Sequence, residues 1–231
     1  MSRKKKIAVL TGAGISAESG IRTFRETGGL WEDHDVMEVA SFAGWVKNQE
    51  LVLNFYNERR RQLKKVNPND GHTELVKLEE EYDVTVITQN VDNLHERAGS
   101  SNIIHLHGEL TKVRSTTHDH LIYEWEKDLN IGDKCEMGSQ LRPHIVWFGE
   151  MVPMLDPASR IVEQTDVAII VGTSMQVYPA AGLIAYASSG IPIYYVDPNP
   201  SINYELRSIK NLKVIQEPAT TGVKKVVEEL I

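Results

Sequence analysis

The sequence has few features of a secreted, membrane-bound or nucleic-acid-binding protein. Its single cysteine, Cys135, excludes an internal disulfide and a four-cysteine zinc site. No stretch approaches the ~20 apolar residues of a membrane span. The apolar run 7–10 that follows the basic start is too short for the core of a signal peptide. The net charge of −7 argues against general nucleic-acid binding, because phosphate backbones require a basic face. We expect a cytoplasmic monomer that binds neither membranes nor nucleic acid.

Short apolar runs alternate with helix-length segments along most of the 231 residues. The runs predict buried strands at 7–10, 84–88, 103–105, 167–171, 193–197 and 212–215. Helical patterns fall at 44–65, 71–80, 158–164, 180–188 and 221–230. This alternation predicts an α/β fold with a Rossmann-like, doubly wound parallel sheet. Segments 28–66 and 111–142 break the alternation and predict a smaller inserted lobe, which leaves 1–27, 67–110 and 143–231 for the core of a single catalytic domain.

A glycine-rich turn that contains Gly12 and Gly14 follows the first predicted strand and opens a helix. Such a turn lets the backbone approach a phosphate, although tight strand-to-helix turns use glycine without any ligand as well. A dehydrogenase would place an acidic residue at the end of a second strand about 20 residues further on. That spacing falls on Glu32 and Asp33, which follow no strand pattern. The turn therefore favours a bound nucleotide without hydride transfer.

Polar side chains follow two further predicted strands. Gln89, Asn90 and Asp92 come directly after 84–88, and His107 comes after 103–105. Ligands of open α/β sheets lie beyond the carboxyl ends of the strands, where these groups can reach ribose hydroxyls and a carboxamide. A histidine there can take a proton from a hydroxyl. Asn and Asp also form ordinary turns, and a single histidine is often structural, so spacing alone leaves both interpretations open. We expect His105 to point to the opposite face and to take no part.

Several motifs together resemble the sirtuins, the NAD-dependent protein lysine deacylases. They are Gly12-Ala13-Gly14-Ile15-Ser16, Gly20-Ile21-Arg22-Thr23-Phe24-Arg25, Gln89-Asn90-Val91-Asp92, His107-Gly108 and Gly172-Thr173-Ser174. The resemblance runs from residue 6 to the carboxyl end in the family's order and spacing. Two further stretches, Tyr56-Asn57-Glu58-Arg59-Arg60 and 141–150, resemble the class III subgroup, the desuccinylases and demalonylases.

The resemblance assigns roles to named positions. Catalysis would fall to His107 and Asn90. NAD, consumed as a co-substrate, would be bound by Gly12, Ala13, Gly14, Ser16, Glu18, Thr23, Phe24, Arg25, Trp31, Gln89, Asn90, Val91, Asp92, Gly172, Thr173, Ser174, Asp197, Pro198, Asn199 and Ala219. Asp197-Pro198-Asn199 departs from the Asn-x-Glu pattern that is usual on the family's adenine side. The acylated lysine of a protein substrate would contact Ala40, Tyr56, Arg59, Val146, Trp147, Phe148, Gly149 and Glu150, and 146–150 would pair with the peptide as an added strand.

The implied reaction begins when the acyl oxygen attacks the anomeric carbon of the nicotinamide ribose and nicotinamide leaves. His107 then removes a proton from a ribose hydroxyl, and water completes the release of free lysine and O-acyl-ADP-ribose. Two alternatives remain: a protein mono-ADP-ribosyltransferase that uses the same cleavage, and a binding module that senses NAD without turning it over.

Tyr56 and Arg59 lie at positions i and i+3 of a predicted helix, so both can face one pocket. An arginine fork and a tyrosine hydroxyl suit an acyl group that ends in a carboxylate, such as succinyl or malonyl. The alternative is an amphipathic helix whose tyrosine packs and whose arginine is solvated. With the resemblance, we expect succinyl and malonyl groups to be preferred, with some deacetylation.

Most sirtuins hold a structural zinc ion with four cysteines in the small lobe. At the matching positions this chain has Ser115 and keeps only Cys135. We therefore expect no zinc, and a lobe held together by packing around Leu121, Tyr123, Trp125 and Leu129. A replacement metal site formed by His118, Asp119, His120 and Cys135 is the alternative.

Overall fold

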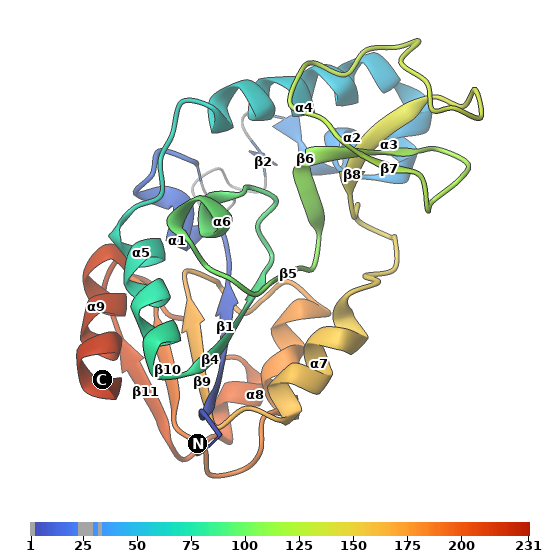
Figure 1. Ribbon diagram of the computed structural model, residues 1–231. Coiled ribbons are helices and arrows are strands. Elements are labelled where there is room, and N and C mark those ends of the chain that lie inside the picture. Colours follow the sequence, from blue (N-terminus) through green and yellow to red (C-terminus); the bar gives the residue numbers. More distant parts are fainter. Residues whose placement is uncertain (1–2, 23–29, 32–33) are drawn as a thin grey trace.

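The computed structural model describes residues 3–22, 30–31 and 34–231. Within these residues the largest element is a parallel sheet in the order β11-β10-β9-β1-β4-β5 (Figure 1). Its strands are β1 (Lys6–Thr11), β4 (Asp83–Thr88), β5 (Ile103–His105), β9 (Val167–Val171), β10 (Ile193–Val196) and β11 (Leu212–Ile215). The first strand, β1, lies in the middle of the sheet; β4 and β5 follow on one side of it, and β9, β10 and β11 follow on the other. This order is that of a Rossmann-like, doubly wound sheet, as the sequence predicts, with its switch point between β1 and β9.

Helices cover both faces of this sheet, because alternate side chains of each buried strand point to opposite faces. On one face, α5 (Asp70–Lys77) and α9 (Ala219–Leu230) pack on a cluster that includes Val9 and Ile169. On the other face, α7 (Leu155–Glu163) and η3 (Ala180–Tyr186) pack on a cluster that includes Ala8 and Ile170. Three shorter helices, α1 (Gly14–Ala17), α6 (Leu94–Ala98) and α8 (Tyr204–Arg207), follow strand ends or loops.

A smaller lobe stands over the carboxyl edge of the sheet, at the top of Figure 1. It contains the helices α2 (Val36–Val39), α3 (Phe42–Lys47) and α4 (Gln49–Leu63). It also contains an antiparallel sheet of β6 (Gly108–Ser115), β7 (Ile122–Glu124) and β8 (Leu141–Ile145), and the short pair β2 (Leu30–Trp31) and β3 (His34–Asp35). Its own apolar cluster joins α4 to the sheet through Val52, Phe55, Val113 and Leu141.

A buried amide ties the helices of the small lobe to the irregular segment that follows β7. The Nδ2 of Asn57 donates to the carbonyl of Leu129 (3.0 Å), and its Oδ1 accepts from the N–H of Leu129 (2.8 Å) and from Nη1 of Arg60 (2.8 Å). Arg60 in turn donates through Nε to the carbonyl of Leu110 on β6 (2.9 Å). Asn57 is only 2 % exposed, so these bonds form away from water.

Some elements differ from the sequence expectation. The single helix expected at 44–65 breaks at Asn48, whose extended backbone (φ −155°, ψ 84°) ends α3 and whose side chain caps α4 by accepting from the N–H of Leu51. The helix expected at 71–80 ends at Lys77 and continues as a short 3₁₀ turn, η2 (Leu78–Glu80), and η3 is also 3₁₀. Strands β6 and β8, which we did not predict from the sequence, extend from Gly108 to Ser115 and from Leu141 to Ile145.

No helix among the described residues is both long and apolar enough to span a bilayer.

Candidate active site

Three glycines bring the ends of β1 and β9 into direct backbone contact at the switch point of the sheet. The N–H of Gly14 donates to the carbonyl of Gly172 (2.7 Å). A Cβ on Gly14 would lie 2.6 Å from the Cα of Gly172, and one on Gly12 would lie 2.8 Å from the Cβ of Thr173. Gly172 has φ +62°, and a Cβ there would lie 2.2 Å from the backbone nitrogen of Ile15. No other residue fits these positions without moving a strand end, and the crevice beside them is where open α/β sheets bind nucleotides.

The predicted polar cluster after β4 assembles against this turn. The Nδ2 of Asn90 donates to the carbonyl of Gly12 (3.1 Å) and to Oγ of Ser16 (3.2 Å). Ser16 donates to Oδ2 of Asp92 (3.0 Å), and the N–H of Leu94 donates to Oδ1 (3.1 Å). Burial raises the pKa of the Asp92 carboxyl, although both of these hydrogen bonds act in the opposite direction. These hydrogen bonds bring Asn90, Asp92 and Ser16 into one buried network beside the glycine turn.

His107 lies beside the same loop with its tautomer fixed. Its Nδ1 is 3.0 Å from the carbonyl oxygen of Gln89, which can only accept, so Nδ1 carries the proton and Nε2 is left as the acceptor. Burial lowers the pKa of His107, with the bond to Gln89 in opposition, so the ring is neutral near pH 7. Gln89 also donates through Nε2 to Oγ1 of Thr173 (3.1 Å), which joins the β4 exit to the β9 exit.

His105 also faces this loop, so our expectation that it points away is wrong. Its Nδ1 lies 3.1 Å from the carbonyl oxygen of Asn90, one residue beyond the carbonyl that His107 contacts. Residues two apart in extended chain share a face, which is why both rings reach successive carbonyls of one loop.

The predicted residues of the adenine side lie at the carboxyl ends of β9 and β10 and at the start of α9. Ser174 follows Thr173 after β9, and Asp197, which is buried, uses Oδ1 to accept from the N–H of Asn199 (2.8 Å). Pro198 is exposed. The carboxylate of Glu18 accepts from the N–H (3.1 Å) and Oγ1 (2.8 Å) of Thr220, so it caps α9 next to the buried Ala219.

Six other predicted cofactor contacts remain outside this arrangement. Thr23, Phe24 and Arg25 lie outside the described residues. Trp31 packs its ring edge-on against Phe55 (centroids 4.9 Å apart) and Tyr56 (6.2 Å), so it belongs to the small lobe's aromatic cluster. Ala13 is the N-cap residue that precedes α1, and Val91 uses its carbonyl to accept from the N–H of Leu110.

Among the predicted acyl-binding residues, Tyr56 on α4 contacts Trp147 of the segment after β8, whereas Arg59 contacts Phe55 and Glu58 of its own helix. Trp147 donates through Nε1 to the hydroxyl of Tyr56 (3.0 Å), and both side chains are buried. Burial raises the pKa of Tyr56, so its hydroxyl keeps its proton. The guanidinium of Arg59 lies over the Phe55 ring (4.5 Å to the centroid) and pairs with Glu58 (3.2 Å). Ala40 lies in the same cluster and accepts from the N–H of Phe148 (2.9 Å).

The segment 146–150 is less available to a peptide than we expected. It is not a strand, and four of its N–H groups donate within the chain: that of Val146 to the carbonyl of His107, that of Phe148 to the carbonyl of Ala40, that of Glu150 to the carbonyl of Trp147, and that of Trp147 to the side chain of Glu150. Glu150 accepts from Nη1 of Arg142 (2.6 Å) and from the N–H of Trp147 (2.8 Å). Glu150 and Trp147 therefore support the site from within. The backbone of Gly149 has φ +88°, which turns the chain beyond the half-exposed Phe148.

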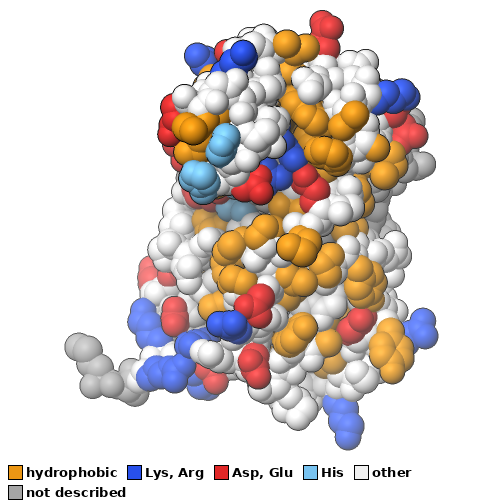
Figure 2. All heavy atoms as spheres, turned by 90° about the vertical axis from the view of Figure 1, so that its right-hand side faces the viewer, with side chains coloured by type: hydrophobic (Ala, Val, Ile, Leu, Met, Phe, Trp, Pro, Cys, Tyr) orange, Lys and Arg blue, Asp and Glu red, His pale blue; other side chains and the backbone are white. Residues whose placement is uncertain are grey.

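Hydrophobic side chains gather around the hollow between the two lobes, while acidic, basic and histidine side chains lie within it (Figure 2). The exposed apolar residues include Phe42, Val46, Phe148, Met151, Met154 and Tyr178. An apolar rim around a polar centre is typical of a site that binds a chain segment and acts on one polar group of it.

The positions that hold zinc in most sirtuins carry a hydrogen-bonded turn. The thiol of Cys135 donates to Oγ of Ser115 (3.4 Å), which also accepts from the N–H groups of Thr117 (3.3 Å) and His118 (3.2 Å). Within the described chain, one group of three metal-ligand side chains converges to within 4.8 Å, namely Glu96, His105 and Glu109. The alternative set His118, Asp119, His120 and Cys135 is not among such groups.

Fold and site together define a class of protein: a Rossmann-like domain with a glycine-lined crevice at its switch point and a neutral histidine at the edge of that crevice. Residues 12–179 match the Sir2 family. The chain is 55% identical over 227 residues to a Helicobacter pylori protein named NAD-dependent protein deacylase, covering 98% of this chain and 96% of that one. It is 52% identical over 233 residues to a Bacteroides thetaiotaomicron protein of the same name, covering 98% of each. The crystal structure of a Sir2 homologue in complex with NAD superimposes with a TM-score of 0.87 at 40% identity, covering 98% of this chain and 90% of that one. The chain belongs to the Sir2 family.

Proposed function

We propose that this protein is an NAD-dependent protein lysine deacylase that consumes NAD and releases nicotinamide, O-acyl-ADP-ribose and free lysine. The observation that carries the proposal is the convergence of the Gly12–Gly14 turn, Asn90, Asp92 and His107 at one switch point. A module that only binds NAD would not need a neutral histidine with a fixed tautomer beside the ribose-binding edge.

The donor set fits a dinucleotide. The glycine contacts leave no Cβ between the two strand ends, and both recorded hydrogen bonds of the Asn90 side chain use Nδ2. Its Oδ1 is therefore the atom that would accept from a ribose hydroxyl. The Asp92 carboxylate would accept from the N–H₂ of the nicotinamide carboxamide. The Nε2 of His107 would take the proton of a ribose hydroxyl, which its lowered pKa permits at neutral pH.

For the acyl group, we propose a preference for succinyl and malonyl over acetyl. Because Trp147 donates to the Tyr56 hydroxyl, the proton of that hydroxyl is the one left for a ligand. Arg59 stands one helical turn further along α4, where its guanidinium would form a charge-assisted pair with the acyl carboxylate. Ala40 lies in the same apolar cluster, and its small side chain would leave the pocket deep.

The test is a panel of acetyl, succinyl and malonyl peptides incubated with NAD, with products followed by mass spectrometry. In Arg59→Met, desuccinylation should fall about ten-fold or more, since one charge-assisted pair contributes roughly 1.5–3 kcal/mol, and deacetylation should change little. The matched control is Arg61→Met on the same helix, because Arg61 is exposed and pairs with Asp128 on the surface of the small lobe. Equal loss of both activities in Arg59→Met would mean that Arg59 is structural.

A further inference from the structure

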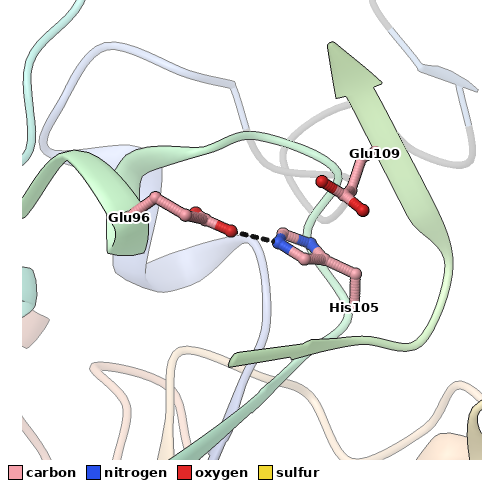
Figure 3. Close-up of side chains that lie close together, drawn as sticks. All are labelled: Glu96, His105 and Glu109. Carbon is pink, nitrogen blue, oxygen red and sulfur yellow. Dashed lines mark hydrogen bonds and ion pairs between the residues drawn. The ribbon is translucent and has the colours of Figure 1, made fainter. Parts of the chain in front are cut away.

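Outside the residues assigned above, the described part of the chain has a compact cluster of titratable side chains beside Asn90, in the loop that follows β4. It consists of Glu96 on α6, His105 at the end of β5 and Glu109 on β6 (Figure 3). The dashed line in Figure 3 marks the short contact between Oε1 of Glu96 and Nε2 of His105, at 2.6 Å. The other ring nitrogen, Nδ1, lies 3.1 Å from the carbonyl oxygen of Asn90.

With Glu96 ionised, as its lowered pKa indicates, these two contacts are satisfied only by a protonated ring. The Asn90 carbonyl can only accept, so Nδ1 must carry a hydrogen. With Nδ1 protonated, a neutral ring would turn the lone pair of Nε2 toward the Glu96 carboxylate. The imidazolium form donates from both nitrogens and satisfies both oxygens, and a 2.6 Å contact is typical of a charge-assisted bond.

Charges around the ring agree with this protonation state. Burial acts to lower the pKa of His105, but the bond to Glu96 and the carboxylates of Glu96 and Glu109 raise it, and the net direction is upward. The pKa of Glu96 is lowered, because the pairing with His105 outweighs its partial burial. Other titratable groups that face the ring are Asp92, whose carboxylate interacts with it favourably, and His95, whose pKa is held well below its ordinary value mainly by burial.

We propose that His105, as a cation paired with Glu96, is a positioning residue for the reaction of the proposed function. Its Nδ1–H fixes the peptide group between Asn90 and Val91, and so sets the direction of the Asn90 side chain toward the ribose-binding edge. His107 fixes the preceding peptide through Gln89. Two histidines thus hold successive carbonyls of one loop, and they act in opposite protonation states, His107 neutral as a base and His105 charged as a clamp.

The proposal rests on the proposed function and gives it a second pH limit. Activity should fall on the acid side when His107 becomes protonated. It should fall on the alkaline side when His105 loses its proton, because the cation exists only below its pKa.

The first experiment measures kcat/KM for NAD with a saturating acyl peptide from pH 5.5 to 9.5. Glu96→Gln keeps an oxygen that can accept from Nε2 but removes the charge, so the alkaline limit should move down by about one pH unit, the smaller end of the effect of an adjacent charge. At pH 9 this is about a ten-fold loss, while the value at pH 7 changes less than about three-fold. The control Glu81→Gln, an exposed carboxylate at the end of η2, should follow the wild-type profile.

His105→Gln removes the titrating group, so the loss of activity at alkaline pH should disappear from its profile. At every pH, the factor by which kcat falls should exceed the factor by which KM for NAD rises. A loss of the same factor at all pH values in Glu96→Gln would mean that the pair is merely structural and would overturn the proposal. An unchanged profile would overturn it as well.

A second measurement separates this proposal from the proposed function. Imidazole proton resonances, recorded by NMR on the protein without substrates, report the titration of His105 whether or not the protein turns over. The resonance that is absent in His105→Gln should have its titration midpoint above pH 6.5 in the wild type. In Glu96→Gln that midpoint should move to a lower pH. If that resonance titrates at or below 6.5 in the wild type, the clamp is refuted even when deacylation is observed. If no deacylation occurs but the resonance behaves as expected, the proposed function fails and the charged pair stands.

Discussion

The contact between the ends of β1 and β9 makes a quantitative prediction for Gly14→Ala. The new methyl carbon would lie 2.6 Å from Cα, 2.7 Å from O and 2.9 Å from C of Gly172, all of them backbone atoms that cannot rotate away. Overpacking of this kind costs about 1–3 kcal/mol, and separating the strand ends would also weaken the 2.7 Å bond from Gly14 to Gly172, at about 1 kcal/mol. We expect the free energy of unfolding to fall by about 3 kcal/mol and ADP-ribose binding to weaken with it.

The assay is urea unfolding followed by far-UV circular dichroism, together with calorimetric titration of ADP-ribose. Gly182→Ala is the matched control, because Gly182 also lies in a helical turn and a Cβ there meets only the ring of Tyr178, at 3.8 Å. That variant should be unchanged or more stable by up to about 1 kcal/mol. A Gly14→Ala protein within about 0.5 kcal/mol of wild type would refute the claim that backbone contact demands this glycine.

Three further predictions concern the small lobe and pH. Asn57→Ala should cost about 3 kcal/mol in chemical unfolding, because it leaves buried groups of Leu129 and Arg60 unpaired; a cost below 1 kcal/mol would contradict the role given to this amide. Elemental analysis should find well under one zinc ion per chain, and EDTA should leave the melting temperature unchanged; stoichiometric zinc would overturn the account of Cys135. Burial lowers the pKa of His72 to about 4, so the unfolded chain binds a proton that the folded chain refuses between pH 6.5 and 4. As the pH is lowered through that window, the free energy of unfolding should therefore fall by up to about 1.4 kcal/mol per pH unit, and the slope should be smaller in His72→Gln. Equal slopes in the two proteins would exclude His72 as the cause.

Much of the sheet could be predicted from the sequence, because each strand is a short apolar run buried on both faces. The strands at 103–105, 167–171 and 212–215 match the expectation to the residue. The small sheet could not be predicted in this way. In β6 the burial alternates irregularly, and its pairing with β8 shifts register between Gly108 and Val113, so neither strand shows a clean period of two. The break at Asn48 was visible only as a capping side chain within a helical pattern.

The polar part of the site was predictable for a related reason, since residues that follow parallel strands meet at one edge of the sheet. What the sequence could not show are contacts across the fold. The hydrogen bond from Trp147 to Tyr56 joins residues 91 positions apart. Glu150, which we expected to contact the peptide, instead accepts a hydrogen bond from Arg142 within the chain. The pair of His105 and Glu96 was missed because His105 was placed on the wrong side of its strand. The spacing of His105 and His107 indicates the correct side, because residues two apart in an extended chain face the same way.

Quantitative mass spectrometry of one reaction mixture tests the central claim most directly: NAD, a succinyl-lysine peptide and the purified protein, sampled over time. The account predicts nicotinamide, unmodified peptide and O-succinyl-ADP-ribose in equal amounts, with no nicotinamide when the peptide carries free lysine. Nicotinamide released at the same rate without an acyl group, or ADP-ribose found attached to a protein, would contradict it.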